Sequence, residues 1–166
     1  MLEGVELYDY EDQVVLYLVN LEASVNRLET ALTVLDNAIE HRPDNYRLWW
    51  GKGLIYRRMG KLEEAIECFR AASDLAPDES KIYYHIGIIY YNQGITLREA
   101  SLKIKNNSEY KAVRDQAREK FLEAVKWMEE SYEIDPQDEQ TISILYQLYY
   151  QLQMKDKEET MRKLIR

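Results

Sequence analysis

Residues 46–79 read YRLWWGKGLIYRRMGKLEEAIECFRAASDLAPDE, and this stretch carries the strongest fold signal in the chain. Its apolar and small residues recur three and four positions apart, which is the spacing of one face of an α-helix. Gly60 interrupts the pattern once, and Pro77 ends it because proline lacks an amide proton and restricts the residue before it. The stretch therefore predicts two helices, Tyr46 to Met59 and Lys61 to Ala76, packed as an antiparallel pair.

The same pattern returns along the chain with a fixed period. Pro43 and Pro77 are 34 residues apart, each after a helical segment and before an aspartate. A third copy ends at Pro136, 59 residues after Pro77, and so contains 25 residues more than one period. A period of this length indicates a stack of similar helix pairs.

Eight residues of the 46–79 stretch fall at the characteristic positions of one known family. They are Trp49, Gly53, Tyr56, Gly60, Ala65, Phe69, Ala72 and Pro77. In this register the stretch resembles the tetratricopeptide repeat family. Lys52 alone departs, because the family favours Leu there, and we expect its aliphatic stem to follow the packing seam with the ammonium group in water.

The resemblance implies an all-α fold in which antiparallel helix pairs stack into a right-handed superhelix of about four repeats. We expect residues 1–166 to form one array, with full repeats at 12–45, 46–79 and 80–138. Residues 1–11 fit the end of a truncated preceding repeat, and residues 139–166 fit a partial capping repeat.

The 25-residue insertion in the third repeat continues the helical pattern past Gly94 through Leu97, Ser101 and Ile104. Asn106, Asn107 and Ser108 indicate a turn with a helix cap, after which the pattern resumes at Tyr110. We therefore predict that both helices of this repeat are elongated by about 12 residues and project roughly 18 Å beyond their neighbours. A disordered loop over residues 95–119 is the alternative.

The run from Tyr110 to Leu148 is similar to tetratricopeptide proteins of bacterial cell envelopes that carry such extended repeats. This leaves the compartment open between the cytoplasm and the periplasm or cell envelope. No apolar run in the sequence approaches the roughly 20 residues of a membrane span, so we expect no direct span.

Composition disfavours several classes of function. The chain has 30 acidic and 22 basic residues, for a net charge of -8, which disfavours nucleic acid as the main partner. The single Cys68, at a buried position of the second helix, and the two histidines, 44 residues apart, offer no recognisable metal or nucleophile site. The sequence contains no Gly-rich phosphate loop, and we expect neither a cofactor nor catalysis.

The resemblance implies that the first helix of each pair lines the inside of the superhelix. Positions 2, 5, 9 and 12 of each such helix share one face. The candidate ligand-binding residues at these positions are Arg47, Trp50, Leu54, Arg57, Lys81, Tyr84, Ile88, Tyr91, Gln147 and Tyr150. The face is aromatic, amide-bearing and basic, so we predict a scaffold that binds a peptide or partner segment of acidic character.

Two alternatives stay open at this point. In one of them, Trp50, Tyr84 and Tyr91 pack between adjacent helices, and Arg57 and Arg58 are solvated charges. In the other, the chain is a self-association or assembly module that acts through the projecting hairpin. Tyr110, Val113, Phe121 and Trp127 would then form an apolar patch, and the chain would be a homo-oligomer.

Overall fold

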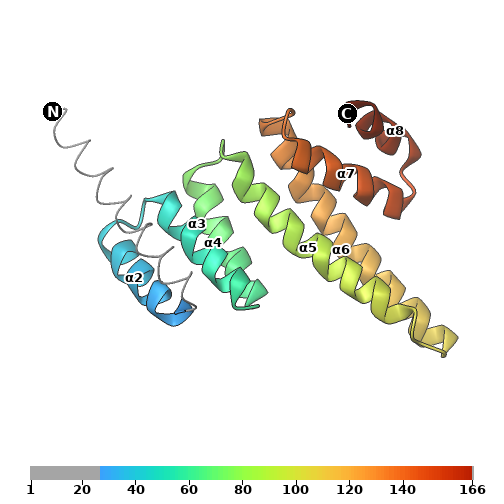
Figure 1. Ribbon diagram of the computed structural model, residues 1–166, viewed down its shortest axis with the longest axis horizontal. Coiled ribbons are helices and arrows are strands. Elements are labelled where there is room, and N and C mark those ends of the chain that lie inside the picture. Colours follow the sequence, from blue (N-terminus) through green and yellow to red (C-terminus); the bar gives the residue numbers. More distant parts are fainter. Residues whose placement is uncertain (1–26, 166) are drawn as a thin grey trace. The chain divides into compact units, whose positions relative to one another are not determined.

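The computed structural model describes residues 27–165, and these form helices and short turns without a strand. The prediction of an all-α fold is confirmed. The helices, labelled as in Figure 1, are α2 (Leu28–His41), α3 (Tyr46–Arg58), α4 (Leu62–Leu75), α5 (Ser80–Ser101), α6 (Asn107–Ile134), α7 (Glu139–Leu152) and α8 (Lys155–Leu164).

The chain divides into two compact units, Met1–Pro77 and Asp78–Arg166. The described part of the first unit contains α2, α3 and α4, and the second contains α5 to α8. The predicted partial repeat at 1–11 and the first helix of the predicted repeat at 12–45 lie outside the described residues. The superhelix and the repeat boundaries stay predictions.

In the first unit, α3 and α4 form the predicted antiparallel pair. Asn45 caps α3 by accepting a hydrogen bond from the amide of Arg47, and Gly60 turns the chain with a φ of 76°. A β-carbon on Gly53 would lie 2.6 Å from the ring of Phe69, so the missing side chain allows the two helices to approach closely. Phe69 and Ala65 are fully buried at this seam.

Helix α2 packs on α3 through a core of Ala31, Leu35, Leu48 and Ile55. Lys52 reaches across this boundary, and its ammonium nitrogen lies 2.6 Å from a carboxylate oxygen of Asp36. The Lys52 side chain is 18% exposed, and its ammonium group is paired with a carboxylate in addition to following the packing seam. Burial lowers the pKa of Lys52, but the hydrogen bond to Asp36, the charge of Asp36 and smaller contributions from Cys68 and Tyr56 together raise the pKa overall.

In the second unit, α5 and α6 form the long hairpin seen in Figure 1, with 22 and 28 residues against 13 and 14 in α3 and α4. Two glycines hold the pair close. A β-carbon on Gly87 would lie 2.9 Å from Met128, and one on Gly94 would lie 2.6 Å from the ring of Phe121. The predicted elongation is confirmed, and the disordered-loop alternative is wrong.

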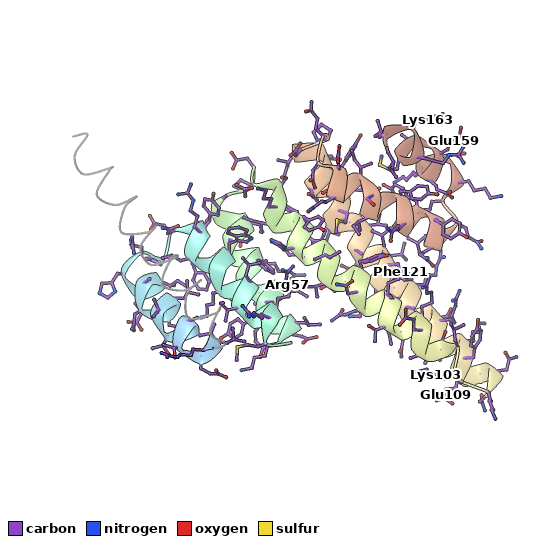
Figure 2. The ribbon with its side chains drawn as sticks, viewed as in Figure 1. Arg57, Lys103, Glu109, Phe121, Glu159 and Lys163 are labelled. Carbon is purple, nitrogen blue, oxygen red and sulfur yellow. The ribbon has the colours of Figure 1, made fainter. Side chains whose placement is uncertain are left out.

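The hairpin turns at residues 102–106, near Lys103 and Glu109 at its tip (Figure 2). Asn106 caps α6 by accepting from the amides of Ser108 and Glu109. The distance of about 18 Å by which the hairpin is predicted to project beyond its neighbours stays a prediction.

Helices α7 and α8 are fixed to α6 by polar contacts as well as by the core. The hydroxyl of Ser131 donates to the backbone oxygen of Ser80 at 3.0 Å and lies 3.2 Å from the hydroxyl of Thr141. Nearby, Tyr149 and Lys157 both donate to Oε1 of Glu129, at 2.7 and 2.6 Å. Burial and then the bond to Glu129 raise the pKa of Tyr149, so its hydroxyl remains a donor.

Candidate functional site

Six predicted ligand-binding residues lie on α5 and α7, within the second unit. Tyr84, Ile88 and Tyr91 are half-buried and pack against the core that α6 and α7 share. Lys81, Gln147 and Tyr150 are exposed, and Tyr150 is 62% exposed. The α5–α7 face, by which we mean these six residues, therefore combines a half-buried aromatic floor with exposed polar and aromatic groups.

The hydroxyl of Tyr91 donates a hydrogen bond to Oε1 of Gln147, which connects α5 and α7 across 56 residues of sequence. The Tyr91 ring also lies 6.2 Å from the ring of Phe121, measured between centroids. Burial raises the pKa of Tyr91, and the charge of Arg98 opposes that rise. Tyr91 is therefore a neutral donor at neutral pH with a fixed ring.

The other four predicted residues lie on α3, in the first unit. Arg47 is exposed and its guanidinium lies 5.6 Å from the centre of the Tyr46 ring. Trp50, Leu54 and Arg57 are half-buried along the same helix. The ten candidates thus form two sets, four on α3 and six on α5 and α7, and each set is held by its own unit.

The apolar patch considered for self-association is changed by the structure. Phe121 is 4% exposed and packs on Gly94, so it belongs to the hairpin core, not to the surface. The ring of Trp127 lies 6.1 Å from the ring of Tyr83, measured between centroids, and is tilted by 31° to it. Tyr110 and Val113 are half-buried. The apolar side chains that the hairpin does expose are Leu102 and Leu122, at 72% and 41%.

One feature was missed from the sequence. A hollow of about 220 Å³ lies where α5 and α6 meet the end of α7. It is lined by Arg98, Arg114, Asp115, Ala117, Arg118, Phe121, Gln151, Leu152 and Gln153. A signal was present, because Arg98 follows Tyr91 by two helical turns and Arg114 and Arg118 are one turn apart on α6.

Within residues 27–165, no three His, Cys, Asp or Glu side chains are grouped so as to hold a metal ion. Among the helices of that segment, none combines the length and the apolarity that a membrane crossing requires.

Comparison with known proteins identifies the helix pairs. Residues 53–94 match a family model described as a TPR repeat. Over these residues the chain is similar to a tetratricopeptide repeat. The matched region covers the second half of α3, all of α4 and the first two thirds of α5, and it includes both Gly53 and Gly87.

A relative in sequence is the TPR repeat-containing protein MJ0941 of Methanocaldococcus jannaschii, 34% identical over 61 residues. The match covers 37% of this chain and 18% of the relative. The chain thus spans under a fifth of the length of that tetratricopeptide relative.

Solved structures share the fold of these tetratricopeptide repeats. The human IFIT1 dimer with m7Gppp-AAAA matches with a TM-score of 0.68 and 18% identity, over 91% of this chain and 32% of that one. A thermophilic TPR protein of Thermus thermophilus, TTC0263, matches with a TM-score of 0.60 and 17% identity, over 92% and 71%. At such identities the likeness shows the fold alone.

Proposed function

We propose that this chain is a non-enzymatic interaction module that binds a partner protein through the α5–α7 face. Tetratricopeptide repeats are generally protein interaction scaffolds, so the class of function follows from the fold. The observation that carries the assignment to this face is the hydrogen bond from Tyr91 to Gln147. It connects predicted ligand-binding residues of two helices into one surface.

The chemistry of the face supports a peptide ligand. Tyr84 and Tyr91 are held by the core, so binding costs them little side-chain entropy, and Tyr150 offers a large exposed ring. Aromatic and arginine side chains dominate binding energy at protein interfaces. The half-buried floor and the exposed rim are the arrangement that an interface centre requires.

The charge of the face supports an acidic ligand. Positions 81, 84, 88, 91, 95 and 98 follow one side of α5 and hold Lys, Tyr, Ile, Tyr, Ile and Arg, without a carboxylate. The facing positions of α7 that we predicted, Gln147 and Tyr150, are uncharged. With Arg98, which lies beyond the face, this side of α5 carries a charge of +2 in a chain of -8, and that favours an acidic segment over a neutral or basic one.

A peptide display experiment tests this function. Random twelve-residue peptides are selected on the wild-type chain, and the affinity of the best binders is measured by fluorescence anisotropy. We expect acidic sequences with aromatic or aliphatic residues, and a loss of about tenfold or more in affinity with Tyr150→Ala combined with Lys81→Glu.

The matched control is Lys163→Glu, which makes the same charge change on α8, away from the face. Selection of no peptide, or equal loss in the control and the face variant, would remove the α5–α7 face from the proposal. Sedimentation velocity on the same samples addresses the self-association alternative, for which a dimer abolished by Leu102→Glu would be the positive result.

A further inference from the structure

The hollow at the end of α7, which we call the arginine hollow, is lined by three arginines from two helices. Arg98 comes from α5, and Arg114 and Arg118 come from α6, while Gln151, Leu152 and Gln153 close the hollow from the end of α7. Arg98, Arg114 and Arg118 all lie in the 25-residue insertion, outside the 34-residue repeat pattern. The hollow is therefore a product of the elongated hairpin.

The arginine hollow carries more positive than negative charge. Throughout residues 27–165, no side chain or backbone group forms an ion pair or hydrogen bond with any of its three guanidinium groups. Asp115 lines the same hollow, so the side chains there sum to a charge of +2. The carboxyl end of α7 adds roughly half a negative charge, which leaves a clear excess of positive charge.

The walls of the hollow keep the site in shape. Ala117, Phe121 and Leu152 are almost fully buried beneath it and belong to one core cluster. Phe121 is in addition held by its contact with Gly94. Charges beside a rigid apolar wall interact more strongly with a ligand than charges in open water do.

From this geometry we propose that the arginine hollow binds a phosphoryl dianion carried on a side chain of the partner protein. A phosphoryl group brings a charge close to -2 and three acceptor oxygens, which matches the local charge of +2 and several guanidinium forks. A single carboxylate would neutralise half of that charge. Recognition of phosphorylated segments by arginine clusters follows the same physical rules.

The position of the hollow connects it to the α5–α7 face, and the peptide part of this inference rests on the proposed function. Arg98 lies seven residues beyond Tyr91 on the same side of α5, about 10 Å along the helix. Its charge already acts on the hydroxyl of Tyr91. In an extended segment bound along α5, one residue would lie over Tyr91. A phosphorylated residue about three positions further along the segment would then lie in the hollow.

The first experiment uses inorganic phosphate, which needs no partner. In the full chain, the arginine Nε–Hε resonances are followed by NMR during a phosphate titration. We expect saturable shifts of Arg98, Arg114 and Arg118, weakened about tenfold or more by Arg98→Gln or Arg118→Gln. Arg98→Lys keeps the charge without the fork and should weaken binding less. The control, Arg162→Gln on α8, should change nothing.

Small chemical-shift changes spread over all arginines would contradict a phosphate site in the hollow. A circular dichroism spectrum of each variant checks that the helices remain. Because these arginines have no internal partners, their replacement by glutamine is expected to leave the fold intact.

The second experiment uses three labelled peptides, Asp-Leu-Glu-X-Leu-Glu with phosphoserine, serine or glutamate at X. We expect the phosphoserine peptide to bind about tenfold or more tightly than the serine peptide, and the preference to disappear with Arg118→Gln. Equal binding of all three, with affinity still lost on Tyr150→Ala, would reject the phosphoryl site but keep the proposed function.

Binding of inorganic phosphate without binding of any peptide would keep the oxyanion site. It would reject the proposal that a protein segment carries the phosphoryl group. An oligoadenylate RNA serves as the last probe. Tight RNA binding that depends on the same arginines would overturn the assignment to a phosphorylated protein.

Discussion

Cys68 lies on α4 with 5% of its surface exposed, against the ammonium group of Lys52 and several carboxylates. Burial raises the pKa of its thiol from 9.0 to about 11, and Glu67 and Asp36 add to the rise, while Lys52 opposes it. The sequence predicted a buried position for this residue, and the structure places it there. A buried thiol of high pKa is a poor nucleophile.

This environment predicts slow alkylation of Cys68 by iodoacetamide. At pH 8 a thiol of pKa about 11 is ionised about a hundredfold less than one of pKa 9.0, so the native chain should react at least that much more slowly. The rate should rise with pH up to about 11. Mass spectrometry measures the rate of alkylation in the folded chain and in the chain unfolded in guanidinium chloride. Rapid labelling of the folded chain at pH 8 would show that the thiol is accessible.

At the scale of elements, local signals fixed the helix ends of the α3–α4 pair. The predicted helices 46–59 and 61–76 differ by one residue from the observed ends. Asn45, Gly60 and Pro77 explain this accuracy, because a cap, a left-handed glycine and a proline each act through the backbone of adjacent residues.

The hairpin turn was predicted too late in the sequence. Asn106 to Ser108 indicated a turn, but α5 ends at Ser101 and Asn106 is the cap of α6. The hydroxyl of Ser101 donates to the backbone oxygen of Arg98 at 2.6 Å, a local bond that competes with continued helix. An apolar pattern that runs on through Ile104 cannot reveal this competition.

The α5–α6 seam predicts a test of close packing. Gly94→Ala places a β-carbon 2.6 Å from two ring atoms of Phe121, and overpacking of this kind costs about 1–3 kcal/mol. Alanine recovers up to about 1 kcal/mol of helix propensity, so we expect net destabilisation of about 1–2 kcal/mol. Urea denaturation measures the change.

The destabilisation caused by Gly94→Ala should be smaller when the ring of Phe121 is removed. In a Phe121→Leu background, Gly94→Ala should cost much less, since leucine leaves room for the added carbon. Thr96→Ala, on the exposed side of α5, is the control and should change stability little. A Gly94→Ala variant more stable than the wild type would contradict the close approach of the two helices.

At the scale of the whole molecule, burial is organised by unit. One core cluster joins α2 and α3, and the other joins α6, α7 and α8 with half-buried side chains of α5. The sequence carried only part of the signal for the arginine hollow, which is the spacing of its arginines within each helix. Arg98, Arg114 and Gln151 belong to three helices, and helical periodicity within each gives no information on which helix ends meet.

The two units predict a regional response to mutation. Gly94→Ala should lower the free energy of opening of α5, α6 and α7 by the amount that it destabilises the fold, so their amides should exchange faster. The free energy of opening of α3 and α4 should change by less than about 0.5 kcal/mol, because repeat arrays unfold in local blocks. Hydrogen exchange with mass spectrometry resolves the two sets of peptides. Equal acceleration in both sets would indicate one cooperative block.

The turn at residues 102–106 gives the protein a natural grafting position. Leu102 is 72% exposed there, and the turn lies at the tip of the hairpin, away from the Ser131 and Glu129 bonds that fix α7 and α8. An epitope tag or a fluorophore introduced at Lys103 would extend into solvent on a two-helix arm. Such a reporter would make capture of a partner visible while leaving the aromatic floor untouched.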